Sequence, residues 1–311
     1  MKEIIDIKDR EADYKWIYDE AFRTDAGLRA VLLMYDEHSD DKKSHDKILQ
    51  QVDNINYRLF SATHQYLIFL RELNNAERYL QTIYQKNPEY KNAFPYGNPF
   101  FDKVELELSS VFDNIIFQVS SVFDYLGHIV SYMFFRDKSK TIYWSKLAKT
   151  ARGQNNELKN EQAKTIIDLI DRRFAGRLYD YRSRLLHNIR DKHTFSGKRM
   201  VEDSAFYLHF APSDIATKHF KRVFEDIDTE KLQITLTFLA SWIIKATFSE
   251  IEAMLDVLVV EIRKDSHFHH NLFNPKEGNN TFLIVSQNPE TKRIEPVSTV
   301  MWNDYKNKNR S

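Results

Sequence analysis

The stretch VELELSSVFDNIIFQVSSVFDYLGHIVSYMFF, residues 104–135, repeats apolar residues at helical spacing and carries further aromatic residues on both flanks of that stripe. Apolar side chains that nearly encircle a helix are typical of a central position in a bundle. We therefore expect this stretch to be the central helix of a helical bundle, which makes the fold class all-α.

Other segments show the same helical periodicity around this centre. We expect further helices at residues 12–35, 44–84, 166–192 and 229–264. Ser44 is a suitable N-cap for the second of them. Residues 151–160 are polar and contain a glycine, so they are expected to form a loop, whereas residues 193–213 look irregular.

The C-terminal part differs in character from the helical part. Residues 281–286 and 297–302 are β-like, and the turn-forming residues 288–291 lie between them, so we expect a small β-hairpin. The chain then divides into an N-terminal helical extension packed on the body, residues 1–100, a bundle, residues 101–265, and a tail, residues 266–311.

Composition excludes several classes of protein. Apolar residues make up 42% of the 311 residues and aromatic residues 14%, which is enough for a substantial core. The absence of cysteine excludes disulfides, thiolate zinc sites and cysteine nucleophiles, and it fits a cytoplasmic protein. No signal peptide is visible at the N-terminus, and the longest apolar run, near residues 257–260, is too short to cross a membrane.

Cofactor motifs are absent from the sequence. With seven glycines, the chain has no phosphate-binding loop and no dinucleotide-binding turn, and it also lacks a nucleophile elbow and an H-E-x-x-H pair. The segment Ser266-His-Phe-His-His270 is rich in imidazoles, but adjacent histidines project in different directions and no carboxylate cluster accompanies them. We therefore expect a polar helix end there, and neither a metal nor another cofactor.

Charge is distributed unevenly, although the formal net charge is zero. Residues 172–199 hold nine basic residues against the two acidic residues Asp180 and Asp191. A local excess of positive charge is typical of a nucleic-acid contact, and equally of the solvated face of a surface helix.

This basic segment contains the sequence Arg182-Ser-Arg-Leu-Leu-His187-Asn188, an Arg-x4-His arrangement. Arginine and histidine with four to six residues between them also occur at Arg58/His64, Arg263/His269 and Arg263/His270. About two such matches are expected by chance, as for any short motif. Only Arg182/His187 lies in the basic segment and precedes one more long helix.

That arrangement resembles the catalytic motif of HEPN proteins, over about residues 104–264. The resemblance implies a bundle of four or five helices, metal-independent cleavage of single-stranded RNA and a homodimer that brings two motifs together. It also implies a bacterial defence or toxin role, with an antitoxin or regulatory protein as a partner. The residue after the arginine is Asn, Asp or His in many active members, whereas it is Ser183 here, which keeps a polar hydroxyl.

The chemistry of RNA cleavage suits these residue types. Histidine exchanges protons near neutrality, so His187 is the candidate acid and base, and Arg182 is the candidate for stabilising the charged phosphate. On an ideal helix, however, Arg182 lies about 140° from His187. Further contacts with RNA or its phosphates are expected from Arg177, Ser183, Arg184, Asn188 and Arg190, and stacking on an unpaired base from Tyr181.

A second hypothesis is a HEPN-like module without catalytic activity, which binds a partner protein or a nucleotide. In that case His187 caps or packs a helix beside a structural arginine. The two hypotheses differ in whether substitution of His187 and Arg182 abolishes RNA cleavage in a folded protein.

Overall fold

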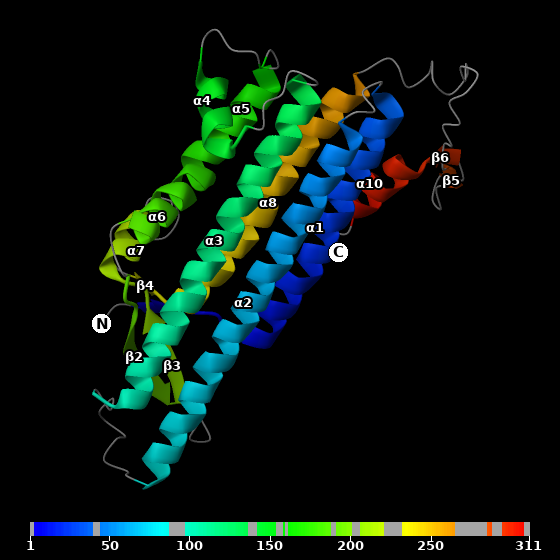
Figure 1. The fold of residues 1–311 in the computed structure, drawn as a ribbon. Coiled ribbons are helices and arrows are strands. Elements are labelled where there is room, and N and C mark those ends of the chain that lie inside the picture. Colours follow the sequence, from blue (N-terminus) through cyan, green and yellow to red (C-terminus); the bar gives the residue numbers. More distant parts are fainter. Residues whose placement is uncertain are drawn as a thin grey trace, which may run out of the picture. The chain divides into compact units, whose positions relative to one another are not determined.

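The computed structural model describes residues 3–39, 44–86, 97–135, 142–153, 158, 161–187, 191–200, 206–220, 232–264, 285–287 and 294–307. Most of these residues are helical, which confirms the mainly helical fold expected from the sequence. The four longest helices are α1 (Arg10–His38), α2 (His45–Lys86), α3 (Pro99–Phe135) and α8 (Leu236–Arg263) (Figure 1). None of the helices in the described part of the chain combines the length and the apolar character that a membrane crossing needs.

The chain forms two compact units, each assembled from three separate segments. The first unit comprises Met1–Tyr18, Phe60–Ser120 and Arg173–Ala246, and the second comprises Asp19–Leu59, Ser121–Arg172 and Thr247–Ser311. Each of the four longest helices contributes residues to both units. The unit boundaries therefore do not fall at residues 100 and 265, where the sequence suggested domain boundaries.

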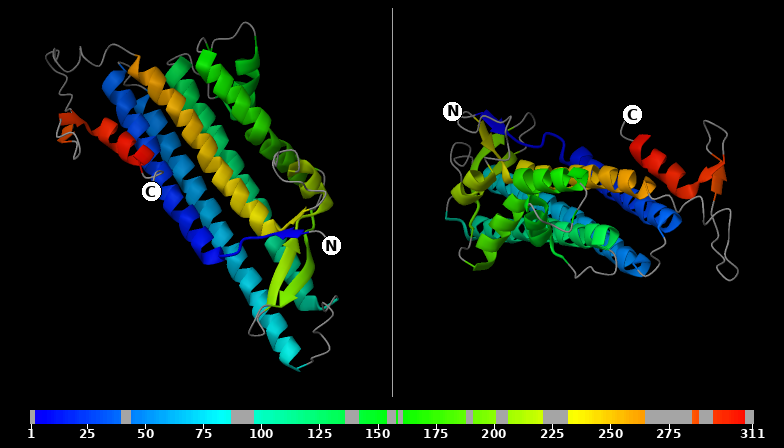
Figure 2. Two further views of the ribbon diagram at one scale, coloured as in Figure 1. Left: turned by 180° about the vertical axis from the view of Figure 1, so that it is seen from behind. Right: turned by 90° about the horizontal axis from the view of Figure 1, so that it is seen from above.

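The first unit contains two small sheets beside its helices. β2 (Thr194–Met200) pairs antiparallel with β3 (Phe206–Ala211), and β1 (Glu3–Ile5) pairs in parallel with β4 (Leu232–Ile234) (Figure 2). Two shorter helices, α6 (Gly176–His187) and α7 (Asp214–Phe220), belong to the same unit.

The core of the first unit is rich in aromatic side chains. It includes Phe112, Tyr181, Phe210 and Phe220, all of which are fully buried. The hairpin is attached to α2 through Glu77, whose Oε1 accepts hydrogen bonds from the backbone nitrogen of Leu208 at 2.9 Å and from Arg10 Nη1 at 3.0 Å.

The second unit adds α4 (Trp144–Arg152), α5 (Glu161–Ile170) and a short hairpin of β5 (Val285–Gln287) and β6 (Ile294–Pro296). A Cβ on Gly127 would lie 3.1 Å from the backbone nitrogen of Trp144, so glycine permits the close approach of α4 to α3. Trp144 is fully buried, packs its ring against Phe123 and donates a hydrogen bond from Nε1 to Asp171.

The last helix, α10 (Val297–Asn307), is attached to α1 and α8 within the second unit. Arg23 Nη1 donates a hydrogen bond to the backbone oxygen of Tyr305 at 2.9 Å, and Lys306 forms an ion pair with Glu252 at 2.7 Å. Tyr305 lies over Gly27, where an added Cβ would come within 2.9 Å of its ring. The packing of α10 on α1 therefore depends on glycine, which has no side chain, at position 27.

Two expectations from the sequence differ from the structure. A C-terminal hairpin is present, but residues 297–302 belong to α10, because the second strand consists of residues 294–296; residues 281–284 lie outside the described part. Residues 193–213 looked irregular, yet they contain the hairpin of β2 and β3. The polar residues between and within these strands obscure the apolar alternation on which strand prediction depends.

Candidate functional site

The predicted motif lies on α6, a regular α-helix from Gly176 to His187 that follows a π-helical turn over Asp171–Ala175. The irregular turn ends before the motif begins. Because successive residues of a regular helix are rotated by about 100°, Arg182 and His187 point in directions about 140° apart. The backbone of a single chain does not bring these two side chains together.

One face of α6 is exposed and carries Ser183, Arg184 and His187. None of the three side chains forms a hydrogen bond or an ion pair with another residue in the described segments. Leu186, beside His187 in sequence, is also exposed, with 58% of its surface accessible. This face therefore presents a guanidinium, an imidazole and a hydroxyl group, none of which forms an ion pair with a carboxylate of the described residues, although the exposed Asp180 lies one helical turn before Arg184.

Arg182 lies on a different side of the helix and is half-buried. The carbon at the centre of its guanidinium is 6.0 Å from the centroid of the Phe117 ring on α3, a cation–π arrangement. The geometry thus gives Arg182 a packing contact, whereas Arg184 is the arginine that shares a face with His187.

The other predicted phosphate ligands are Arg177, Asn188 and Arg190. Arg177 is half-buried, and its backbone oxygen accepts a hydrogen bond from His219 Nε2 at 2.7 Å. Burial lowers the pKa of His219, and the positive charges of Arg184 and Arg177 lower it further, although the hydrogen bond to Arg177 opposes them. Asn188 and Arg190 lie outside the described residues.

Tyr181 occupies the buried face of α6 and is completely inaccessible. Its ring packs against Phe220 and His219, with centroid separations of 5.1 Å and 5.4 Å, and its hydroxyl donates a hydrogen bond to Asp191 Oδ2 at 2.6 Å. Burial, followed by the nearby carboxylates, raises the pKa of the Tyr181 phenol far above its ordinary value. The expectation that this ring stacks on a base is wrong, because the core already surrounds it.

Beneath α6, Asp191 forms an acidic pair with Asp113 on α3. Asp191 is 4% exposed, and Asp113 Oδ1 has no hydrogen-bond partner among the described residues. Burial raises the pKa of Asp113 to about 7, and the negative charge of Asp191 adds to this rise.

His193 lies beside this pair and is also fully buried. Its Nδ1 accepts a hydrogen bond from the backbone nitrogen of Ser213 at 2.9 Å, so the neutral ring carries its proton on Nε2. That nitrogen has no hydrogen-bond partner in the described part of the chain. Burial lowers the pKa of His193 to about 4, which keeps the ring neutral at physiological pH.

The segment that follows α6 is attached to α3 by polar contacts. The backbone nitrogen of His193 donates to Ser109 Oγ at 3.2 Å, and that of Phe195 donates to Glu105 Oε1 at 2.9 Å. Lys192 forms an ion pair with the same glutamate at 3.1 Å. These contacts hold residues 192–195, which follow the motif in sequence, against α3.

Sequence reasoning missed the group formed by the half-buried Asp113 with the buried Asp191 and His193. The available signal was the position of Asp113 in an apolar stretch. An isolated acid there indicates either burial of its carboxyl group or an interruption of the apolar stripe. In the described segments, no group of three histidine, aspartate or glutamate side chains is placed to hold a metal ion. The histidine-rich segment 266–270 lies outside those segments.

Comparison with known proteins does not assign the chain to a family. No family model, no curated protein and no solved structure matches it.

Proposed function

We propose that the chain is a metal-independent endoribonuclease that cleaves single-stranded RNA on the exposed face of α6. The observation that carries the proposal is the common exposure of Arg184 and His187, three residues apart on one helix and without a carboxylate partner in the described residues. Residues three apart lie side by side on a helix surface. One phosphodiester can therefore contact both side chains.

Each side chain has a distinct task in this proposal. The imidazole of His187 exchanges a proton with the ribose or with the leaving group, because histidine is suited to proton transfer near neutral pH. The guanidinium of Arg184 binds the phosphate oxygens, and Ser183 supplies a hydroxyl beside it. Arg182, which the family resemblance favours as the phosphate ligand, acts from its position against Phe117 as a support for the helix.

Cleavage needs both a base and an acid, and each copy of the motif holds one histidine. We therefore propose a homodimer in which one His187 removes the proton of a 2′-hydroxyl and the other protonates the departing 5′-oxygen. The 2′-oxygen forms a bond to phosphorus while the bond from phosphorus to the 5′-oxygen breaks. The products are a 2′,3′-cyclic phosphate and a 5′-hydroxyl, without any change in oxidation state.

The proposal is tested by incubating the protein with end-labelled single-stranded RNA in the presence of EDTA. We expect products that end in a 2′,3′-cyclic phosphate, and a loss of rate of about 100-fold or more in His187→Ala. Arg184→Ala should lose more activity than Arg182→Ala. The matched control is the double variant Arg58→Ala/His64→Ala, which removes a pair of similar spacing from α2 and should cleave RNA normally.

A catalytically silent interaction module is the second candidate function. The observation that favours it is Leu186, which exposes an apolar side chain next to His187 and suits a protein partner as well as RNA. Intact RNA after incubation with the unmodified protein, or equal cleavage by the folded His187→Ala variant, would support this candidate and refute the nuclease. The defence or toxin setting is part of the nuclease proposal and is lost with it.

A further inference from the structure

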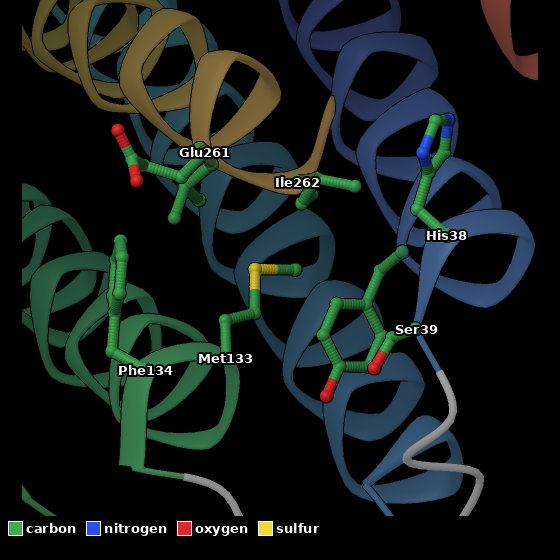
Figure 3. A pocket seen from close by; sticks show the side chains of 8 residues that line it. His38, Ser39, Met133, Phe134, Glu261 and Ile262 are labelled. Carbon is green, nitrogen blue, oxygen red and sulfur yellow. The ribbon is translucent and has the colours of Figure 1, made fainter. Parts of the chain in front are cut away.

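The second unit contains a pocket of about 230 Å³ at the ends of three helices (Figure 3). Tyr35 and His38 come from α1, Met133 and Phe134 from α3, and Glu261 from α8. None of these residues belongs to the site proposed above on α6. A pocket of this size accommodates a small molecule rather than a peptide or a nucleic acid.

All three helices present their C-terminal ends to the pocket. α1 ends at His38, α3 at Phe135 and α8 at Arg263, and the lining residues lie in the last two turns of each. The final carbonyl groups of a helix have no partner within it, and each C-terminal end carries a partial negative charge of about half an electron. The three helix ends therefore contribute negative potential to the pocket.

The side chains of the lining reinforce this preference for positive charge. Glu261 contributes a carboxylate whose side chain is only 16% exposed, and Figure 3 shows it on the same side of the pocket as the ring of Phe134, opposite His38. One of its partners is Lys264, whose side chain is 61% exposed. An ion pair with so exposed a cation contributes little to stability, so a cation held in the pocket can compete with Lys264 for the carboxylate.

The rest of the lining combines the polar side chains of His38 and Ser39 with aromatic and apolar ones. Met133 projects into the middle of the pocket in Figure 3, and Leu258 and Ile262 line it as well. Aromatic rings attract organic cations, and a thioether beside them adapts to an apolar body. An anion would meet both Glu261 and the helix ends unfavourably.

We propose that this pocket binds a small organic cation, with an ammonium group at Glu261 and an apolar body against Met133 and Phe134. The ammonium forms a charge-assisted hydrogen bond with the carboxylate, and the three helix ends supply the surrounding field. The proposal is independent of RNA cleavage.

The test uses the full chain and phenethylammonium as the probe. The protein is labelled with ¹³C on its six methionine methyl groups, and the Met133 signal is assigned with Met133→Leu. Titration at about pH 8, where histidine is ordinarily neutral, should shift the Met133 signal in a saturable manner. The neutral analogue 2-phenylethanol should bind about tenfold more weakly, and the anion phenylacetate more weakly still.

Two variants separate the roles of the charged residues. Glu261→Gln should weaken binding of phenethylammonium about tenfold and leave that of 2-phenylethanol unchanged. Lys264→Met should strengthen binding, because it removes a cation that competes for the carboxylate. Asp46→Asn, which changes an exposed carboxylate on α2 outside the pocket, is the matched control and should bind like the unmodified protein.

The proposal fails if phenethylammonium leaves the Met133 signal unchanged, or if all three probes bind with equal affinity. It also fails if Glu261→Gln, shown to be folded by its circular dichroism, binds the ammonium as tightly as the unmodified protein does.

Discussion

His187 and His193 lie six residues apart, and the fold gives them opposite environments. His187 ends α6 on an exposed surface, whereas His193 is fully buried with one ring nitrogen hydrogen-bonded to Ser213. Burial lowers the pKa of His193 to about 4, which removes it from proton exchange near neutral pH. Of these two histidines, only His187 therefore lies on a surface that an RNA in solution can reach.

The two faces of α6 differ in the same way. The inner face carries Tyr181, which is packed among aromatic rings and hydrogen-bonded to Asp191, while the outer face carries Ser183 and Arg184 without partners among the described residues. Substitutions on the inner face should change stability, and substitutions on the outer face should change function alone.

The largest effect is expected from Tyr181→Ala. The variant removes a buried ring and leaves Asp191 without its hydroxyl partner, so we expect a loss of about 3 to 5 kcal/mol in the free energy of unfolding. Tyr181→Phe keeps the ring and should lose about 1 to 3 kcal/mol. Urea denaturation measures both values, and a Tyr181→Ala variant as stable as the unmodified protein would contradict the division.

Asp113→Asn should change how stability depends on pH. The raised pKa of Asp113 makes the folded state bind more protons than the unfolded state between about pH 4 and 7, so this group lowers stability as pH rises. The lowered pKa of His193 has the opposite effect between about pH 4 and 6.5, because there the unfolded state binds more protons.

The two contributions oppose each other in the unmodified protein. Asp113→Asn removes the first of them, so the stability of this variant should rise with pH from about 4 to 6.5 more steeply than that of the unmodified protein. Denaturation midpoints measured across this range check the sign. Identical pH profiles for the two proteins would show that Asp113 keeps its ordinary pKa in the folded state.

A smaller effect is expected from Arg182→Met. The substitution keeps an unbranched side chain over Phe117 and removes the cation–π contact, which should lower stability by about 0.5 to 1 kcal/mol. Phe117→Leu is the reciprocal control, and the double variant should lose less than the sum of the two single losses. Additive losses would mean that the guanidinium and the ring do not interact.

The smallest change in stability is expected on the outer face of α6. Ser183→Ala, Arg184→Ala and His187→Ala should each remain within about 0.5 kcal/mol of the unmodified protein, since their side chains are exposed. Thermal unfolding measures this directly. A large loss in any of them would indicate a structural role for that side chain and would weaken its assignment to RNA cleavage.

Sequence periodicity predicted the long helices well, because an apolar stripe such as that of residues 104–135 depends on local spacing alone. It also predicted that Arg182 lies about 140° around the helix from His187, which follows from helical geometry.

The pairing of Asp113 with Asp191 could not be predicted in the same way. Asp113 and Asp191 are far apart in sequence, and only the packing of α3 against the segment after α6 makes them neighbours. The burial of Tyr181 was missed for the same reason, because a tyrosine in a basic segment suits stacking and core packing equally, and tertiary contacts decide between them.

The packing of α10 on α1 in the second unit leaves no room for a Cβ atom at Gly27. A glycine within a helix ordinarily lowers helix stability by about 1 kcal/mol relative to alanine, but here its bare backbone is the surface on which the ring of Tyr305 rests. Alanine at this position would stabilise α1 as an isolated helix, but its Cβ would collide with the ring of Tyr305 and displace α10. Alanine therefore suits α1 alone but not the packing of α10 on α1, so the residue at position 27 is constrained by a tyrosine 278 positions further along the chain.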